Sequence, residues 1–363
     1  MTPDNTNANS SSDATYHASG PVKSGSGHPG RGLFWLAVGM VVVGLAIIGV
    51  ALTSMLQPQP LPYERTTSKA EPASYQAVTL PEAKGAKPDV ERVEWHTPNV
   101  RGPVAASLIM RENNGRVVPL DWQNFVTDPV FFADLSIGEV SKVMAAIRKH
   151  VSEDAVVLSW WDLSRKIRLI AGRQAPLDDS LARGLQIPAA WSDSREAVQR
   201  EERAFWGKTA TKSASDSFST FIDALANDEE HGAEVLRSLG ANSEVFIAVH
   251  LSDIWKLAAS RPNKIGIAYR DFPSAGLAHG VIKTVRQWIA DKKMTFPYAI
   301  EPIGNAVRVH YFTDGSSSNT LLAKLLPFSE SNPLLLKNFE LVYQHRGFWI
   351  YKLRGAEPRM STR

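Results

Sequence analysis

The pattern of apolar and polar residues divides the chain into four parts. Residues 1–31 are rich in Ser, Asn, Gly and Thr, and such a composition cannot bury enough apolar surface to offset its conformational entropy. Residues 32–56 are almost entirely apolar, whereas residues 57–103 are rich in Pro, Ala, Lys and Glu. From Val104 onward, short apolar segments recur with the spacing of helices and strands. We therefore expect a disordered tail, an apolar helix, an extended stalk and a folded domain, in that order.

The apolar part predicts a transmembrane helix. No charged residue occurs between Leu33 and Leu56, and at about 1.5 Å per residue the segment can span a hydrocarbon core of about 30 Å. It is also much longer than the apolar run of a cleaved signal peptide. Lys23 and Arg31 precede it, whereas the first charge after it is Glu64. The positive-inside rule predicts a single-pass inner-membrane anchor with the N-terminus cytoplasmic and the bulk of the chain periplasmic.

Residues 104–355 predict an α/β domain with a mixed sheet and C-terminal antiparallel hairpins. Ser136 and Glu139 form a capping-box pattern at the head of an amphipathic helix, which leads into a buried strand over 155–159. The further elements that we expect are helices over 194–206, 215–225, 233–239 and 275–292, strands over 245–249 and 264–269, and hairpins over 298–312 and 339–353. Residues 356–363 are expected to be a disordered C-terminus.

Composition and missing motifs exclude several kinds of function. None of the 363 residues is cysteine, which excludes disulfides, thiolate nucleophiles, iron–sulfur clusters and covalently bound haem c. The net charge of +3 is spread over the whole chain, whereas nucleic-acid binding usually needs a concentrated basic face. Nucleic acid is therefore not an expected partner. The sequence has no Gly-x-Ser-x-Gly elbow, glycine-rich phosphate loop or His-x-x-x-His pair. We expect no cofactor and no metal site.

The densest cluster of polar and aromatic side chains follows the strand at 155–159. It comprises Trp160, Trp161, Asp162, Arg165, Arg168, Arg173 and Asp178. Ligands of open α/β sheets bind at strand ends, so one interpretation is a pocket in which arginines bind an anionic group against a tryptophan wall. The other is a structural corner, in which Asp162 pairs with an arginine and the tryptophans fill the core. Both interpretations stay open at this point.

Polar side chains also follow the next two predicted strands. His250 and Asp253 follow the strand at 245–249, and Arg270 and Asp271 follow the strand at 264–269. If the first two strands are neighbours, their ends face one crevice, where a histidine can act as a base or a ligand. The alternatives are a helix cap for Asp253 and a solvated turn for the third pair. All four residues are candidates for binding a ligand or a partner.

One local resemblance concerns the segment VVLSWWDLSRKIRLIAGR and the following Asp178. It resembles the Trp-Trp-Asp-Tyr-Gly region of oligosaccharyltransferase catalytic subunits, where the motif helps to recognise the acceptor sequon. Trp160, Trp161 and Asp162 are kept, but Leu163 and Ser164 replace the Tyr and Gly. The resemblance implies a related domain and an alternative function, that of a glycan- or peptide-binding or transferase-like protein.

A second resemblance covers the chain from the anchor to about Leu353. The anchor, the stalk and the segments SWWDLSRKIRLIAGR, VFIAVHLSDIWKL, KIGIAYRDFP and VYQHRGFWIYKL resemble the HaoB family. Members of that family are hydroxylamine-oxidation proteins encoded beside the multihaem hydroxylamine oxidoreductase in ammonia oxidisers and some methanotrophs. The resemblance implies a membrane-anchored periplasmic accessory protein of nitrification-type nitrogen metabolism. Its expected partners are that oxidoreductase or associated cytochromes, and it is expected to bind rather than to catalyse.

Overall fold

The structure is a computed structural model, and part of the chain is described in it. The described residues are 30–56, 60–81, 88–178, 184–207, 211–241, 243–273, 278–303 and 306–355. The chain divides into two units, Met1–Pro58 and Gln59–Arg363, and the second is called the folded unit below. Apart from residues 30 and 31, the two tails expected to be disordered lie outside the described residues.

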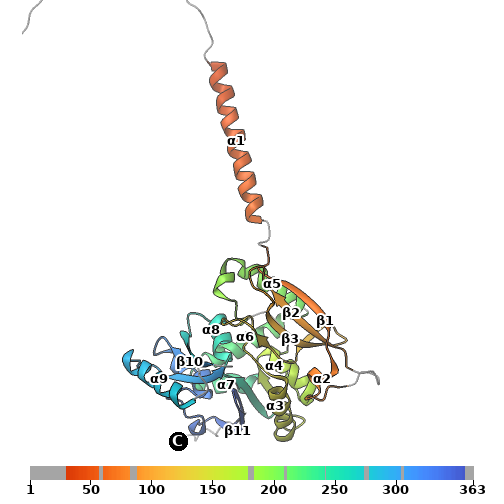
Figure 1. Ribbon diagram of the computed structural model, residues 1–363, viewed down its shortest axis with the longest axis vertical. Coiled ribbons are helices and arrows are strands. Elements are labelled where there is room, and N and C mark those ends of the chain that lie inside the picture. The colour runs from red at the N-terminus through yellow and green to blue at the C-terminus, as the bar shows by residue number, and fades with distance from the viewer. Residues whose placement is uncertain are drawn as a thin grey trace, which may run out of the picture. The chain divides into compact units, whose positions relative to one another are not determined.

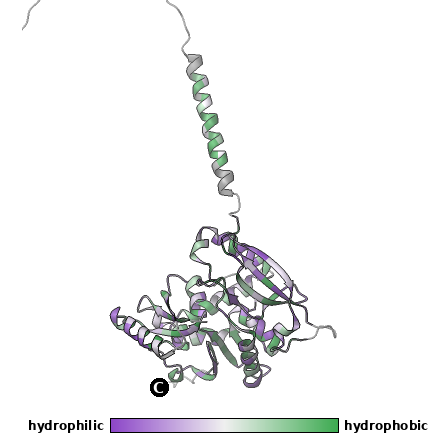
Figure 2. Ribbon diagram, viewed as in Figure 1, coloured by the Kyte–Doolittle hydropathy of each residue, from purple (hydrophilic) through white to green (hydrophobic). Residues whose placement is uncertain are grey.

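The first unit contains one helix, α1, which runs over Gly30–Leu56 (Figure 1). A helix over 32–56 is therefore confirmed, with a start two residues earlier than expected. Large apolar side chains in its middle part are exposed, among them Phe34, Trp35 and Met40, and Figure 2 shows this part of the helix as apolar. Within the described residues, no helix combines the length and the apolar character needed to cross a membrane.

An antiparallel sheet opens the folded unit. Its strands are β1 (Glu64–Lys69), β2 (Val90–His96), β3 (Pro103–Arg111) and β4 (Val117–Pro119) in that order, with β5 (Gln123–Asn124) beside β3. The short helix α2 (Pro72–Tyr75) lies between β1 and β2. The expected stalk over 57–103 is therefore wrong. Val93 and Trp95 alternate along β2 and are fully buried, a period-two pattern that the surrounding Pro, Lys and Glu residues obscure.

A buried carboxylate fixes the beginning of the folded unit. The Glu202 side chain accepts hydrogen bonds from Tyr63 Oη at 2.6 Å and Arg65 Nη2 at 2.8 Å. Two indole N–H groups complete the set, those of Trp95 at 3.3 Å and Trp206 at 2.7 Å. Because Glu202 lies on α5 (Arg195–Phe205), these bonds tie the first strand to a helix more than a hundred residues away.

The second sheet is mixed, as expected, and has the strand order β11-β12-β7-β6. Strands β6 (Val156–Ser159) and β7 (Val245–His250) are parallel neighbours, whereas β12 (Phe348–Leu353) pairs antiparallel with both β7 and β11 (Phe339–His345). Helix α3 (Ile137–His150) begins with the expected capping box of Ser136 and Glu139.

The two faces of the mixed sheet are covered by different helices. Val157, Phe246 and Ile350 share a hydrophobic cluster with α3. Leu158, Ile247 and Tyr351 alternate with them and share another cluster with α6 (Lys212–Leu225) and α7 (Glu229–Leu239). The sheet is therefore the middle layer of the folded unit, and its strand ends form one rim of the site described below.

The third sheet has the order β8-β10-β9, with β8 (Ile267–Pro273), β9 (Tyr298–Ile303) and β10 (Ala306–Phe312). The two expected hairpins, β9 with β10 and β11 with β12, are confirmed. Helix α9 (Ala278–Asp291) contributes Val281 and Val285 to a small cluster with this sheet. The remaining helical segments are α4 (Trp161–Lys166), a π-helical turn (Ile167–Ala171), α8 (Asp253–Ser260), α10 (Leu321–Leu325) and 3-10 turns at Ala189–Ser194, Ser317–Asn319 and Pro333–Leu335.

Candidate functional site

A small polar cavity lies at the carboxyl ends of the two parallel strands. Helix α4 follows β6 and helix α8 follows β7, and because the strands are parallel neighbours, both helices start at the same sheet edge. The cavity measures about 30 Å³, room for a few atoms rather than for a drug-sized ligand. Its apolar wall is formed by Pro119, Trp122, Phe132, Leu135, Leu163 and Phe348.

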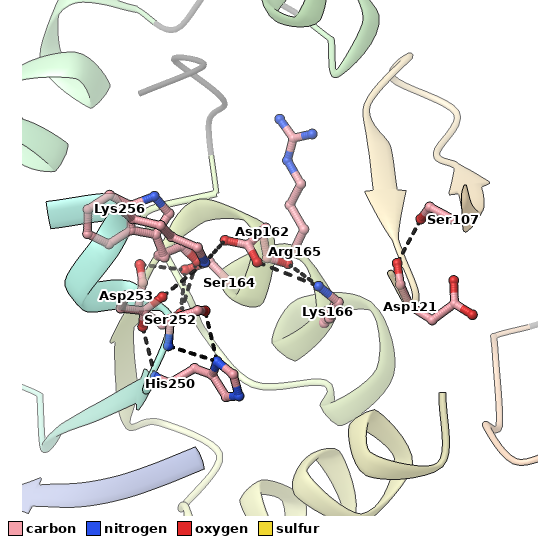
Figure 3. A network of polar contacts seen from close by, with 12 residues as sticks. Ser107, Asp121, Asp162, Ser164, Arg165, Lys166, His250, Ser252, Asp253 and Lys256 are labelled. Carbon is pink, nitrogen blue, oxygen red and sulfur yellow. Dashed lines mark hydrogen bonds and ion pairs between the residues drawn. The ribbon is translucent and has the colours of Figure 1, made fainter. Parts of the chain in front are cut away.

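An ion network of buried side chains lines the polar side of the cavity (Figure 3). Lys256 Nζ lies 2.9 Å from Asp162 Oδ1 and 2.9 Å from Asp253 Oδ1. Burial alone would raise the pKa of Asp162, but Lys256 and Lys166 outweigh it and hold that pKa below its usual value. Burial likewise opposes the charge of Lys256, yet the two aspartates raise its pKa. Asp162 and Lys256 are therefore both ionised at neutral pH.

His250 lines the cavity as a neutral imidazole. Its backbone N–H donates to Asp253 Oδ2 at 2.8 Å. Its ring Nδ1 accepts the backbone N–H of Ser252 at 3.2 Å and lies 2.8 Å from Ser252 Oγ. Because Nδ1 accepts, the proton of the neutral ring belongs on Nε2. Burial lowers the pKa of His250, which favours this uncharged form.

Lys166 and Asp121 also line the cavity. The Lys166 side chain is 3% exposed, and its Nζ lies 3.7 Å from Asp162 Oδ2 and 3.4 Å from the Asp162 carbonyl oxygen. Burial lowers the pKa of Lys166 to about 8. Asp121 accepts the Leu108 backbone N–H at 2.6 Å, and burial raises its pKa to about 6. Both groups therefore change charge close to neutral pH.

The two tryptophans of the Trp-Trp-Asp segment lie in the core. Trp160 is 1% exposed and Trp161 is fully buried. The Trp160 ring packs against Phe218 with centroids 5.4 Å apart, and the Trp161 ring packs against Trp206 at 5.8 Å. They do not form the exposed aromatic wall of the first interpretation. Their positions agree with the structural corner, in which tryptophans fill the core.

The arginines of the predicted cluster bind backbone and carboxylate groups away from the cavity. Arg165 donates to the carbonyl oxygens of Asp178, Val117 and Trp206. Arg168 forms an ion pair with Asp178. Arg173 donates to the carbonyl oxygens of Val151 and Arg148, each at 2.8 Å, and so holds the end of α3.

Asp162 does not pair with an arginine, and that part of the structural interpretation is wrong. Positions 162 and 166 share one face of α4 because they are four residues apart, and this face turns Asp162 toward Lys166 and Lys256. Arg270 and Asp271 lie on β8, where Arg270 stacks over Trp288 and Asp271 forms a two-pronged ion pair with Arg308. Of the predicted site residues, the structure brings together Asp162, His250 and Asp253.

Three titratable residues of the cavity were missed from the sequence: Asp121, Lys166 and Lys256. Lys256 offered a signal, because it lies three residues after Asp253 in the segment HLSDIWKL, where an i,i+3 ion pair is expected on a helix. Lys166 offered a similar signal, because it lies four residues after Asp162, whereas Asp121 offered none. Asp121 follows the short strand β4 in another sheet, and local sequence does not show that it meets α4.

Comparison with known proteins gives the family. Residues 30–353 match the family described as HaoA-associated protein HaoB. The chain belongs to the HaoB family. No curated protein matches this HaoB-family chain. Among solved structures, the chain is similar to the C-terminal domain of PglB from C. jejuni, with 12% identity over 59% of this chain and 98% of that one and a TM-score of 0.35. At that TM-score the likeness says nothing about the function of the HaoB-family chain.

Proposed function

We propose that the chain is a membrane-anchored periplasmic accessory protein of hydroxylamine oxidation, which binds HaoA, the multihaem hydroxylamine oxidoreductase, and is not itself a catalyst. The observation that carries the proposal is the family match over residues 30–353, which includes α1 as well as the folded unit. The description of that family as HaoA-associated supports a protein partner rather than a free-standing reaction.

Helix α1 supports the membrane anchor. Between Leu33 and Leu56 it has no charged residue, and its apolar side chains are exposed, with Trp35 at 68% and Val50 at 69%. A helix that is apolar on all sides needs an apolar surrounding, and a lipid bilayer supplies one. The basic residues before α1 and the absence of charge directly after it support the orientation with the folded unit in the periplasm.

The bonding of the cavity supports a non-catalytic role. Ser252 Oγ and His250 Nδ1 lie 2.8 Å apart, a distance at which a serine nucleophile and its base would meet. However, His250 Nδ1 also accepts the Ser252 backbone N–H, and Asp253 bonds the His250 backbone rather than its ring. Among the described residues, no carboxylate is hydrogen-bonded to the His250 ring to orient it as a base. The burial of Trp160 and Trp161 also counts against the alternative of a glycan- or peptide-binding site.

The proposal has two direct tests. A reporter fused after Arg363 should be active as alkaline phosphatase and silent as a fluorescent protein that matures only in the cytoplasm. The full chain, extracted in detergent with an affinity tag, should capture HaoA from a lysate of cells that produce both. Cytoplasmic fluorescence would contradict the orientation. Failure to enrich HaoA over an unrelated tagged membrane protein would contradict the partnership.

A further inference from the structure

The buried ammonium of Lys166 lines the cavity and makes only long contacts with acceptors among the described residues. A lysine ammonium has three N–H donors, yet the contacts of Lys166 Nζ within the described residues are at 3.4 Å and 3.7 Å. Ordinary N–H···O bonds measure about 2.7–3.2 Å. Buried polar groups in proteins are almost always satisfied. The Lys166 ammonium, which lines the cavity, therefore has donors left for a molecule inside it.

Acceptors face the same space. Asp162 Oδ1 is bonded to Lys256 at 2.9 Å, whereas the contact of Asp162 Oδ2 with Lys166 is 3.7 Å long. One bond to the Asp121 carboxylate, from the Leu108 N–H, is found among the described residues, and an ionised carboxylate has about four lone-pair sites. Figure 3 shows Lys166 beside the Asp162 carboxylate, with Asp121 on the other side of Lys166. The cavity thus offers donors and acceptors together.

The charges of the cavity decide which kind of molecule is accepted. Two aspartates, Asp162 and Asp253, are matched by two lysines, Lys166 and Lys256. The charge of the third carboxylate, Asp121, is offset by Arg92 as well as by Lys166. An added ion would be buried without a partner of its own, at a cost of several kcal/mol. A neutral molecule avoids that cost. The volume of about 30 Å³ limits it to about two or three heavy atoms.

We propose that this cavity binds a small neutral molecule that has both N–H or O–H donors and lone-pair acceptors. Lys166 Nζ donates to a lone pair of the molecule, and Asp162 Oδ2 and Asp121 accept its protons. Hydroxylamine has this chemistry and this size, and it is the probe to use first. The chemical class follows from the cavity alone, whereas the choice of hydroxylamine rests on the proposed function.

The test is isothermal titration of the full chain in detergent micelles at neutral pH, where hydroxylamine is largely uncharged and Lys166 is still protonated. Hydroxylamine should bind at one saturable site. Ammonium, which has donors but no free lone pair, and nitrite, which has acceptors but no donors, should give no binding at the same concentrations. Absence of hydroxylamine binding, or equal or tighter binding of nitrite or ammonium, would overturn the proposal.

Substitutions locate the binding. Lys166→Met keeps the length of the side chain and removes the donors, so hydroxylamine should bind at least tenfold more weakly. The matched control is Lys283→Met, because Lys283 is exposed on α9, and it should bind like the wild type. If Lys166→Met fails to fold, Asp121→Asn replaces it, because the amide oxygen still accepts the Leu108 N–H while the charge is removed. Unchanged affinity in the folded variant would overturn the proposal.

Capture of HaoA separates this inference from the proposed function. Lys166→Met should still capture HaoA while it loses hydroxylamine binding. If wild-type chain captures HaoA but binds no hydroxylamine, the inference fails and the proposed function stands. If the wild-type chain binds hydroxylamine in a Lys166-dependent manner but does not capture HaoA, the proposed function fails and the inference stands.

Discussion

Glu202 shows how much a single side chain contributes to this fold. Its carboxylate is fully buried and accepts from a phenol, a guanidinium and two indoles. Burial penalises its charge, and the neighbouring Arg65 and Tyr63 compensate only in part, so that its pKa is raised. A buried charge of this kind is costly to form and even more costly to unbalance, because removing one partner leaves the other unpaired.

We therefore expect Glu202→Gln to destabilise the protein by about 3 kcal/mol, since Arg65 loses its buried counter-charge and an amide N–H₂ meets other donors. Denaturant unfolding followed by tryptophan fluorescence measures the change. The control is Glu201→Gln, whose side chain is 42% exposed and lies 3.3 Å from the same arginine. It should cost less than about 1 kcal/mol. Equal losses in the two variants would contradict this account.

Lys166 gives stability an unusual dependence on pH. Its pKa falls from 10.5 to about 8 on folding, so between these pH values the unfolded chain binds more protons than the folded chain. Raising the pH through this window then favours the folded chain by about 1.4 kcal/mol per pH unit. The difference in unfolding free energy between wild type and Lys166→Met should therefore rise from about pH 8 to about pH 10. A constant difference would show that Lys166 stays protonated in the folded chain.

The residues that pair across the cavity explain why the site was only partly predictable. Asp162, His250 and Asp253 were found because they follow two buried strands, and strand ends are visible in the hydrophobic pattern. The partner of Asp162 was expected to be an arginine, because arginines are its neighbours in sequence. Its partner is Lys256, 94 residues away, and a lone sequence has no periodic signal for such a contact.

At the scale of elements, prediction succeeded where the hydrophobic period was clear. The mixed sheet, the capping box of α3 and both C-terminal hairpins follow from apolar runs and turn residues. It failed for β1 and β2, where local composition dominated the interpretation. Strand β1 reads ERTTSK and is mostly exposed, so it has no buried face of its own to reveal it. It is held by backbone pairing with β2 and by the bond of Arg65 to Glu202, neither of which is visible in composition.

The boundary of the folded unit can be tested with fragments. A fragment of residues 60–355 should fold cooperatively, because it keeps Tyr63 and all three sheets. A fragment of residues 104–355 should not, because it removes β1 and β2, opens the edge of β3 and leaves Glu202 without the Tyr63, Arg65 and Trp95 donors. Near-ultraviolet circular dichroism during heating distinguishes the two. Cooperative melting of the shorter fragment would restore the boundary at Val104.

At the scale of the whole molecule, the order of strands along the chain differs from their order in the sheet. Strand β12 is the last strand of the chain, yet it lies inside the mixed sheet, between β11 and β7. Its Tyr351 is fully buried and donates to the Leu325 carbonyl oxygen at 2.6 Å. This bond ties the centre of the mixed sheet to the last residue of α10.

We expect truncation after Gly347 to abolish folding, because it removes β12, leaves β11 without a partner and opens one edge of β7. Truncation after Gly355 should leave the melting temperature unchanged, because it keeps β12 complete. Thermal melts of the two purified proteins measure this contrast. A cooperative transition in the shorter one would show that β7 and β6 hold the fold without β12.

The position of β12 inside the mixed sheet also determines when the folded unit can complete its folding. While the chain is being synthesised, β6 and β7 are complete long before their remaining neighbour leaves the ribosome, so an open strand edge persists in the nascent chain. The cavity also depends on β12, because Phe348 forms part of its wall and packs against His250 with ring centroids 4.5 Å apart. A prematurely terminated chain therefore never acquires the cavity. The cavity forms only after β12 has paired with β7.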